Sequence, residues 1–500
     1  MSEKLKKLKE LLGEVSDINR AASVLSWDQQ VNMPPGGGEA RGQQLATLGK
    51  IAQEKFTSDE VGKLLEDLKQ EFVGAEPASD DAAMIRVAGR NYDKAKRVPP
   101  EFVSEQAIAA TKGFEAWVAA RSKSDFSIFR PHLERNVELV EKYISFFPPS
   151  DHPYDTLLDD YEPGMKTAEV KAIFDGLRPK QVKLIRAIKE SKQVKDDFLH
   201  IKYNEKKLWD FGVDVITQYG YEWSRGRQDK APHPFETTFS VNDVRITTRF
   251  EPENPMATLF STFHESGHAM YEQGINPKYE RTALSGGTSL AIHESQSRMW
   301  ENLVGRSLPF WEHFFPALKK TFPSQLEGVS LKSFYKAINK VEPSLIRVNA
   351  DEATYNLHIM LRLEMEIGMV EGTMPIKDLP EIWNTKMQEY LGVVPPNDAR
   401  GVLQDIHWSY GSIGYFSTYA LGNLVSAQLW EKINKDIRNL DDQIRAGNFS
   451  ELLRWLREKI HRHGHKYDPQ DLVQNVTGSK ITPEPYVRYL TKKYSEIYGL

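Results

Sequence analysis

The stretch from His264 to His268 reads His-Glu-Ser-Gly-His and matches the pattern H-E-x-x-H. On an α-helix, two residues four apart lie one turn above each other on the same face, so both imidazoles can reach one metal ion. Glu265 then sits beside that metal. The spacing therefore predicts a metal-dependent peptidase. The alternative is a helix whose two histidines are ordinary core side chains.

A third metal ligand is expected downstream, because a catalytic zinc usually takes three protein ligands and keeps one position open for water. Glu294 lies far enough beyond His268 for the chain to leave one helix, turn and return antiparallel beside it. We predict Glu294 as this ligand in preference to its neighbour His293, although by itself Glu294 would read as a surface carboxylate. Two histidines and one glutamate, His264, His268 and Glu294, form a ligand set that predicts zinc, and Co²⁺ is an acceptable substitute.

The predicted chemistry is hydrolysis by an activated water. A zinc site with one open position lowers the pKa of water to about 7. We predict that Glu265 is the general base for that water and later the acid that protonates the leaving amine.

The flanking residues predict the helix that must carry the two histidines. Asn254 suits an N-cap, Pro255 suits the first helical position, and Gly274 suits the left-handed residue after the last turn. Apolar residues recur at three- and four-residue spacing on the histidine side. One helix with an inward-facing metal-binding face is therefore expected between these ends.

Glu294 falls near the start of a second predicted helix. The stretch 285–289 is rich in Gly and Ser and reads as a loop, and Ser289 can cap the helix that follows. That helix is expected over 290–304, because Gly305 comes directly after it.

A small hairpin is expected before the first helix. Residues 237–250 alternate as strands do, and Asn242-Asp243 is a plausible turn between two of them. Arg245 and Arg249 fall on the face opposite the apolar residues. This row of arginines could face a cleft, beside an edge strand that pairs with an extended peptide. The alternative is a solvated face.

A peptidase that acts at a C-terminus must recognise a free carboxylate. The planar fork of an arginine side chain fits a carboxylate with two hydrogen bonds. Arg245, Arg249 and Arg347 are the candidates, of which Arg347 precedes a helix expected to start at Asn349, with Glu352 completing a capping box.

Helical periodicity occupies most of the chain. Short Pro- and Gly-containing turns separate the segments, and no linker or low-complexity tract divides them. The sequence therefore predicts a mainly α fold with a small β-sheet near the zinc, organised as a single catalytic unit over residues 1–500.

Several motifs together resemble the M32 family of metallocarboxypeptidases, the carboxypeptidase Taq family. The family pattern has H-P-F, D-x-R-x-T, H-E-x-x-H, H-E-S-(G/Q), I-R-x-x-A-D-E and G-x-x-Q-D-x-H-W in this order. The resemblance spans nearly the whole chain, whose counterparts are His233–Phe235, Asp243–Thr247, His264–His268, His293–Gln296, Ile346–Glu352 and Gly401–Trp408.

The resemblance implies that His264, His268 and Glu294 bind zinc and that Glu265 is the catalytic acid and base. It also implies a gluzincin-type helix in one ellipsoidal unit with a long, deep active-site groove, and a homodimer. The expected partners are peptides with a free C-terminal carboxylate.

The oxyanion formed during peptide hydrolysis needs a positioned donor besides the metal. We predict His407 in this role. Tyr410, Tyr415 and Tyr419 follow it, and their spacing does not select one of them. The charge-free run from there to Trp430 is too polar for a transmembrane span, so a buried helix fits better.

Composition limits the remaining possibilities. The net charge of −5 and the pI near 6.3 give no basic surface for nucleic acid. Zero cysteines exclude disulfides and thiolate ligands. The first residues lack the apolar core of a signal peptide. We therefore expect a cytoplasmic protein that binds neither nucleic acid nor membrane.

Three hypotheses for the function follow. The first is a zinc carboxypeptidase of broad specificity acting on peptides. The second is an oligopeptidase with the same zinc machinery that cuts internal bonds. The third is a catalytically silent helical interaction protein.

Overall fold

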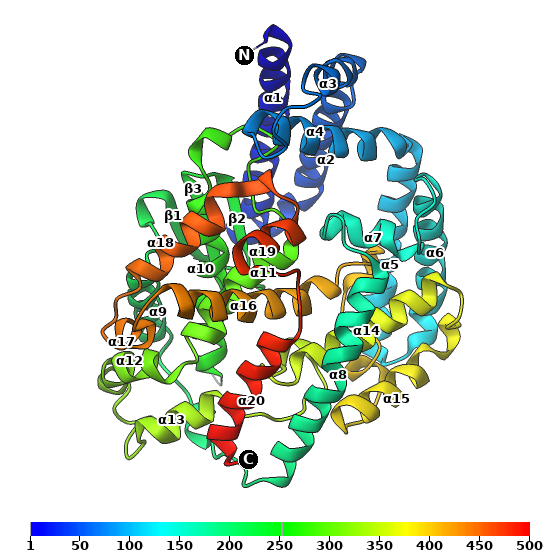
Figure 1. Ribbon diagram of the computed structural model, residues 1–500. Coiled ribbons are helices and arrows are strands. Elements are labelled where there is room, and N and C mark those ends of the chain that lie inside the picture. Colours follow the sequence, from blue (N-terminus) through cyan, green and yellow to red (C-terminus); the bar gives the residue numbers. More distant parts are fainter. Residues whose placement is uncertain (1, 252–253) are drawn as a thin grey trace. The chain divides into compact units, whose positions relative to one another are not determined.

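A computed structural model describes residues 2–251 and 254–500, and most of these residues are helical (Figure 1). They form two compact units. Unit 1 comprises Met1–Lys96, Asp196–Ile338 and Leu429–Gly478, and unit 2 comprises Arg97–Lys195, Asn339–Gln428 and Ser479–Leu500. The expected mainly α fold with a small sheet is confirmed. Each unit draws on three separate segments, so neither is a linker-bounded domain, and the single catalytic unit stays a prediction.

Unit 1 contains the sheet and the two helices that carry the H-E-x-x-H pattern and Glu294. Its α-helices are α1 (Glu3–Val31), α2 (Gly38–Phe56), α3 (Asp59–Glu71), α4 (Asp80–Arg97), α9 (Glu205–Tyr219), α10 (Pro255–Gly274), α11 (Leu290–Arg298), α12 (Leu308–Thr321), α13 (Leu331–Ile338), α17 (Leu440–Arg445), α18 (Ser450–Lys459) and α19 (Pro469–Thr477).

The sheet has three strands in the order β1-β3-β2. Strand β3 (Asp243–Thr248) is central, pairing in parallel with β1 (Gly226–Lys230) and antiparallel with β2 (Glu236–Ser240). The predicted hairpin is therefore confirmed, but its turn lies at Val241-Asn242, one residue before the predicted Asn242-Asp243, because Asp243 is already the first residue of β3 and pairs with Ser240. Strand β1 was not predicted. Val244 and Ile246 of β3 are fully buried, and β3 packs on α10. The sheet thus supports the helix that carries the pattern.

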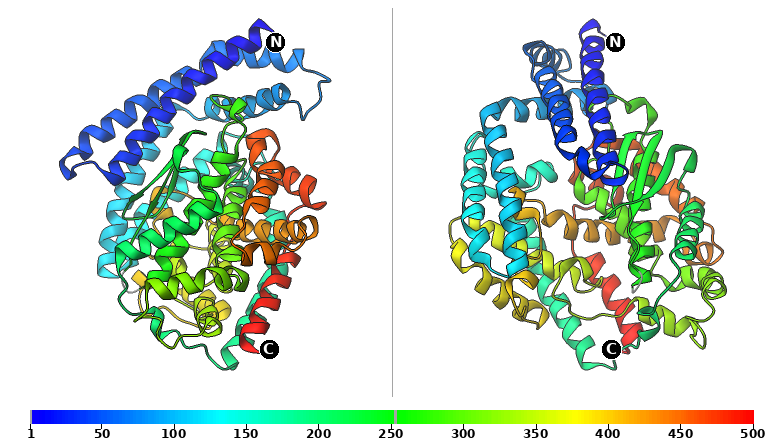
Figure 2. Two further views of the ribbon diagram at one scale, coloured as in Figure 1. Left: turned by 90° about the vertical axis from the view of Figure 1, so that its left-hand side faces the viewer. Right: turned by 180° about the vertical axis from the view of Figure 1, so that it is seen from behind.

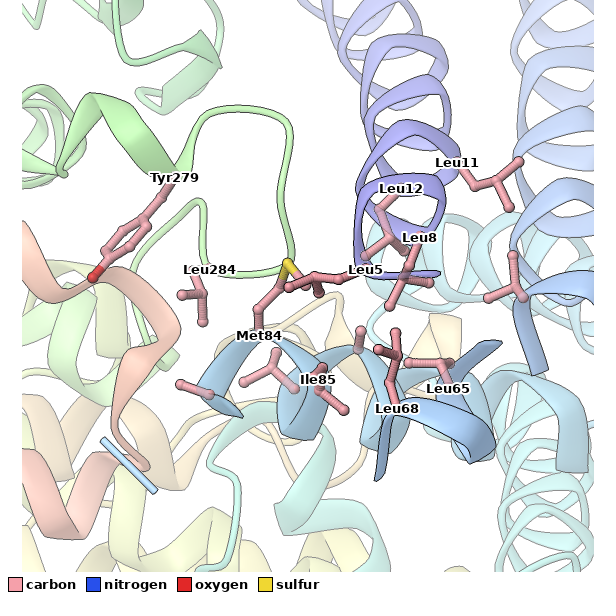
Figure 3. Packing of buried hydrophobic residues seen from close by; sticks show 14 of the residues in the cluster. Leu5, Leu8, Leu11, Leu12, Leu65, Leu68, Met84, Ile85, Tyr279 and Leu284 are labelled. Carbon is pink, nitrogen blue, oxygen red and sulfur yellow. The ribbon is translucent and has the colours of Figure 1, made fainter. Parts of the chain in front are cut away.

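Helices α1, α3 and α4 pack on the connection between α10 and α11. Helices α1 and α2 lie side by side (Figures 1 and 2). Leucines of α1 meet apolar residues of α3 and α4, and the same cluster includes Ile275, Tyr279 and Leu284, which follow α10 (Figure 3). Its labelled members are Leu5, Leu8, Leu11, Leu12, Leu65, Leu68, Met84, Ile85, Tyr279 and Leu284. Apolar burial therefore fixes the loop between the two helices.

Unit 2 is built from helices and short turns. Its α-helices are α5 (Pro100–Lys123), α6 (Phe126–Ser145), α7 (Tyr154–Tyr161), α8 (Thr167–Glu190), α14 (Tyr355–Val370), α15 (Leu379–Leu391) and α20 (Glu484–Tyr498). Helix α16 (Ser417–Asp436) belongs to unit 2 up to Gln428 and to unit 1 from Leu429. None of the described helices combines the length and the apolar character needed to cross a bilayer.

Candidate active site

Helix α10 carries the H-E-x-x-H residues and begins as its sequence predicts. The side chain of Asn254 accepts a hydrogen bond from the backbone N–H of Ala257, and Pro255 is the first helical residue. The prediction for Gly274 was wrong, because this residue ends the helix without a left-handed conformation. A glycine is needed at this position because a Cβ there would lie 2.6 Å from the ring of His461.

The pattern residue Gly267 lets the second helix approach closely. A Cβ at this position would lie 2.7 Å from the backbone oxygen of Gln296 in α11. Ser289 caps α11 by accepting from the N–H of Ile292 at 3.2 Å, as predicted. The close crossing of α10 and α11 brings Glu294 to the two histidines.

Helix α11 continues as a π-helix over Met299–Val304, which ends before Gly305. The predicted end of this second helix is therefore confirmed, and only its last turns differ in type. Single π-turns in helices are frequent at functional sites. Here the π-turn carries Glu301, whose carboxylate reaches His264.

The three predicted metal ligands converge on one point. Nε2 of His264 lies 3.2 Å from Nε2 of His268, and Oε2 of Glu294 lies 3.4 and 3.5 Å from the same two nitrogens. Ligands at about 2.1 Å from a tetrahedral zinc ion lie about 3.4 Å apart. The donor types and their spacing therefore fit a divalent metal such as zinc.

Each ligand histidine is oriented by a second partner. Nδ1 of His264 lies 2.9 Å from Oε2 of Glu301. Nδ1 of His268 lies 2.6 Å from Nδ1 of His293, whose Nε2 lies 3.0 Å from Oε1 of Glu272. Such partners fix the tautomer and leave Nε2 for the metal. His293, the alternative third ligand, thus supports His268.

Arg298 holds the carboxylate of Glu294 in place. Its Nε donates to Oε1 of Glu294 at 2.7 Å, which leaves Oε2 toward the histidines, and its Nη1 donates to Glu301 at 3.0 Å. Burial opposes ionisation of Glu294, but Arg298 and the histidines outweigh it and hold the pKa of this carboxyl well below its usual range. Glu294 is therefore ionised, as a carboxylate metal ligand must be.

Glu265 lies beside the ligands without belonging to the metal-ligand group. Its side chain is buried, and this burial raises the pKa of the Glu265 carboxyl to about 7, with His264 opposing the shift. A bound cation would pull the pKa down again. A carboxyl that exchanges its proton near neutral pH has the property that a general base and acid requires.

Sequence reasoning missed several carboxyl groups of this site. Glu272 follows His268 by one helical turn and Glu301 follows Arg298 by three residues, so helical spacing could have indicated both. For Glu236 of β2 the sequence offers only one weak indication of a functional role, which is its position directly after the H-P-F motif. Burial raises the pKa of Glu236 to about 7, and the negative charge of Glu236 contributes to raising the pKa of Glu265.

Arg245 lies between two aromatic rings in unit 1. Its guanidinium carbon is 4.5 Å from the ring centre of Trp27 and 4.8 Å from that of Phe239, and Nε and Nη2 donate to Asp243. Arg249 is exposed and pairs with Glu251. The two residues of the predicted arginine row therefore have different environments.

Arg347 belongs to a buried polar group in unit 2, here named the arginine cluster: Tyr355, Arg347, Arg362, Gln404 and Asp405. Its Nε and Nη2 donate to Asp405 at 3.0 and 2.9 Å, and Nη1 donates to the hydroxyl of Tyr355 at 2.9 Å. Burial lowers the pKa of the Arg347 guanidinium, but Asp405 outweighs it and the pKa lies above the usual range. Arg347 is permanently charged.

The expected helix start at Asn349 was wrong. Residues Arg347–Asn349 form a short 3₁₀ turn, and α14 begins at Tyr355. The carboxylate of Asp351 accepts from the backbone N–H groups that precede α14, and Glu352 pairs with Lys493 at 2.6 Å. Tertiary pairing thus replaces the capping box.

His407 lies in the 3₁₀ turn His407–Tyr410 of unit 2. Its ring centre is 5.3 Å from that of Tyr415 and 6.4 Å from that of Tyr419, and Tyr419 also lies 5.0 Å from the guanidinium carbon of Arg347. Tyr410 instead is largely exposed and stacks on Phe114. The structure therefore groups His407 with Arg347, Tyr415 and Tyr419.

The chain is similar to proteins of known families. A family model described as Carboxypeptidase Taq (M32) metallopeptidase matches residues 7–494. Thermostable carboxypeptidase 1 of Thermus thermophilus is 39% identical over 98% of both chains, and carboxypeptidase 1 of Bacillus subtilis is 36% identical over 98% of both chains.

Two solved structures have nearly the same fold. An M32 carboxypeptidase from Deinococcus radiodurans R1 superposes with a TM-score of 0.97 at 39% identity, covering 100% of both chains. A Pyrococcus furiosus carboxypeptidase gives a TM-score of 0.95 at 38% identity, covering 99% of both chains.

Proposed function

The chain belongs to the carboxypeptidase Taq (M32) family of metallopeptidases, and on this premise we propose that it is a zinc enzyme removing C-terminal residues from peptides with broad specificity. Membership of the family makes the protein a metallocarboxypeptidase, a peptide hydrolase. The observation that carries the finer proposal is the convergence of His264, His268 and Glu294 beside the buried carboxyl of Glu265.

The metal is proposed to be zinc, held by His264, His268 and Glu294. Two neutral imidazoles and one carboxylate are a common ligand set of catalytic zinc, and Co²⁺ accepts the same donors. When bound, the metal supplies Lewis acidity, which lowers the pKa of a water molecule and polarises the peptide carbonyl.

Glu265 is proposed to move the protons of the reaction. As a carboxylate it takes a proton from the attacking water, and as a carboxylic acid it returns that proton to the nitrogen of the leaving residue. The burial of Glu265 beside the metal-ligand group supports this role.

Arg347 is proposed to bind the C-terminal carboxylate of the peptide, with Arg245 as the second candidate. Both guanidinium groups use Nε and Nη2 for an aspartate. Arg347 is favoured because the ring of Tyr419 lies near both Arg347 and His407. His407 is proposed to donate a hydrogen bond to the developing oxyanion.

Location and assembly are also part of the proposal. We propose a cytoplasmic homodimer that acts on peptides and binds neither nucleic acid nor membrane. Size-exclusion chromatography with light scattering measures the assembly directly.

One experiment separates exopeptidase from endopeptidase action. A mixed peptide ladder and the same ladder with amidated C-termini are digested and read by mass spectrometry. We expect single residues to leave from the free C-terminus only. Internal fragments from both ladders would instead identify an oligopeptidase, and intact ladders would identify a silent interaction protein.

A further inference from the structure

One buried aspartate in unit 2 pairs with two arginines. Oδ1 of Asp405 accepts from Nε and Nη2 of Arg347, and Oδ2 accepts from Nε and Nη2 of Arg362 at 2.7 and 2.5 Å. The side chain of Arg362 is fully buried and that of Arg347 is 7% exposed. Two cations and one anion leave this group with a net charge of +1.

Arg362 faces away from solvent on every side. Besides Asp405, its Nη2 donates to Oε1 of Gln404 at 2.9 Å and its Nη1 donates to the backbone oxygen of His358 at 2.5 Å. Its guanidinium carbon lies 4.5 Å from the ring centre of Trp383. All three nitrogens of this side chain are therefore engaged within the protein, and it cannot itself meet a substrate.

The surplus charge has no second ion-pair partner among residues 2–251 and 254–500: Asp405 is the only carboxylate there that pairs with Arg347 or Arg362. The neighbouring Glu366 accepts hydrogen bonds from Tyr154, Trp408 and Gly414 instead. A buried cation without its own counter-ion is costly. Structural stability alone therefore does not account for the second arginine.

The N–H groups of Arg347 indicate where the surplus positive charge is available to a ligand. A guanidinium has five N–H groups. Three of them are used, two by Asp405 and one by Tyr355, and the described residues provide no partner for the other two, one on Nη1 and one on Nη2. The rings of Phe416 and Tyr419 lie 5.6 and 5.0 Å from the guanidinium carbon. What remains available is a pair of terminal N–H groups.

We propose that Arg362 is a positioning residue for carboxylate recognition: it neutralises Asp405, so that Asp405 can orient Arg347 without cancelling its positive charge. With Arg362 absent, Arg347 and Asp405 form a neutral pair, and an incoming carboxylate meets the repulsion of Asp405. This inference rests on the proposed role of Arg347 in binding the peptide C-terminus.

The test compares one peptide as free acid and as C-terminal amide in the zinc-loaded full-length protein. Arg362→Met should raise KM for the free acid about 10- to 100-fold with a much smaller change in kcat, since uniform binding of the carboxylate is lost. Cleavage of the amide should stay unchanged, because the amide never carried the charge. An equal loss on both substrates would overturn the inference.

A compensating variant keeps the test independent of folding defects. Arg362→Met combined with Asp405→Asn restores the net charge of +1, and its KM for the free acid should return to within about tenfold of the unmodified enzyme. A double variant no better than Arg362→Met would also overturn the inference. Near-ultraviolet circular dichroism and zinc content establish that each variant is folded.

Arg178→Met serves as the matched control. Arg178 is another partly buried arginine of unit 2, and it pairs with Glu364 outside the arginine cluster. The ratio of free-acid to amide cleavage should not change in this variant. If the unmodified enzyme cleaves both peptides equally, the proposed function itself fails. If the unmodified enzyme prefers the free-acid peptide and Arg362→Met keeps the same preference, only the role of Arg362 fails.

Discussion

The candidate metal site of unit 1, here called the metal centre, is rich in buried carboxyl groups, whereas the arginine cluster of unit 2 is rich in buried guanidinium groups. The carboxyl groups around the metal ligands are Glu236, Glu265, Glu272, Glu294 and Glu301, and the arginines that act on them are Arg20, Arg298 and Arg306. Histidines must be neutral to bind metal, so the carboxyl groups outnumber the cations there. In the arginine cluster, two cations share one aspartate.

The opposite surpluses indicate opposite ligands. In the metal centre, carboxylates outweigh burial and raise the pKa of His264 and of His293, whereas burial lowers the pKa of His268 to about 3. In unit 2, burial and the nearby Arg347 lower the pKa of the Arg362 guanidinium, a sign that the cluster lacks negative charge. Under the proposed function, a metal cation completes the first group and a substrate carboxylate completes the second.

The largest expected effect comes from removing the cation. A chelator should abolish hydrolysis, and added zinc should restore it, because three converging ligands hold about one ion per chain. His268→Ala should lose both metal and activity without recovery. Metal analysis alongside peptide hydrolysis checks this, and full activity in metal-free protein would contradict the role given to the metal centre.

The next-largest effect tests the catalytic role of Glu265 separately from metal binding. Glu265→Gln should lower kcat at least about 100-fold, the typical contribution of general acid–base catalysis. Zinc content and fold should be retained, because Glu265 is not in the ligand group. Turnover close to that of the unmodified enzyme, with zinc bound, would remove Glu265 from the mechanism.

The arginine cluster should respond only to a charged substrate terminus. Arg347→Ala should cost about 2 to 5 kcal/mol in kcat/KM for free-acid peptides, since a desolvated carboxylate loses its partner. Amidated peptides should be affected weakly. Arg347→Lys should rescue poorly, because an ammonium lacks the planar fork. The same comparison for Arg245→Ala decides between the two arginines. The arginine whose loss removes the preference for free-acid over amidated peptides is the one that binds the carboxylate.

A smaller effect is expected from the partner of His264. Glu301→Gln removes the carboxylate that orients this ligand, which typically costs about 10- to 100-fold in metal affinity. Competition with a metal indicator measures the dissociation constant. Glu312→Gln, which removes a partly exposed carboxylate of unit 1 paired with Arg445, is the control and should bind zinc normally. Equal affinities in both variants would show that Glu301 does not tune the metal centre.

The smallest effect concerns pH and the arginine cluster. Burial raises the pKa of Glu366 to about 7. Below that pH the carboxyl is neutral, and above it a negative charge appears near Arg362 and offsets part of the positive surplus. KM for free-acid peptides, relative to amides, should therefore rise a few-fold, about 0.5 to 1 kcal/mol, between pH 6 and 8. Glu366→Gln should flatten this ratio; a ratio that keeps its pH dependence in that variant would assign it to another group.

The two regions also differ in how well the sequence predicted them. The candidate metal ligands and Glu265 occupy two helices that follow each other in the chain, so helical spacing and capping residues indicated their placement. The arginine cluster draws on a 3₁₀ turn, helix α14 and the segment with Gln404 and Asp405. No local periodicity links these segments, and Arg362 went unnoticed in the sequence.

The sequence by itself determined the two helices that carry the candidate metal ligands, their N-caps, the hairpin of β2 and β3 and the residue types for hydrolysis, because these depend on contacts within a few turns. Only the tertiary structure decided that Gly274 makes room for His461, that His293 supports His268, and that Arg362 shares Asp405 with Arg347. These features depend on packing and on charges buried between distant segments, whose energies no local sequence pattern records.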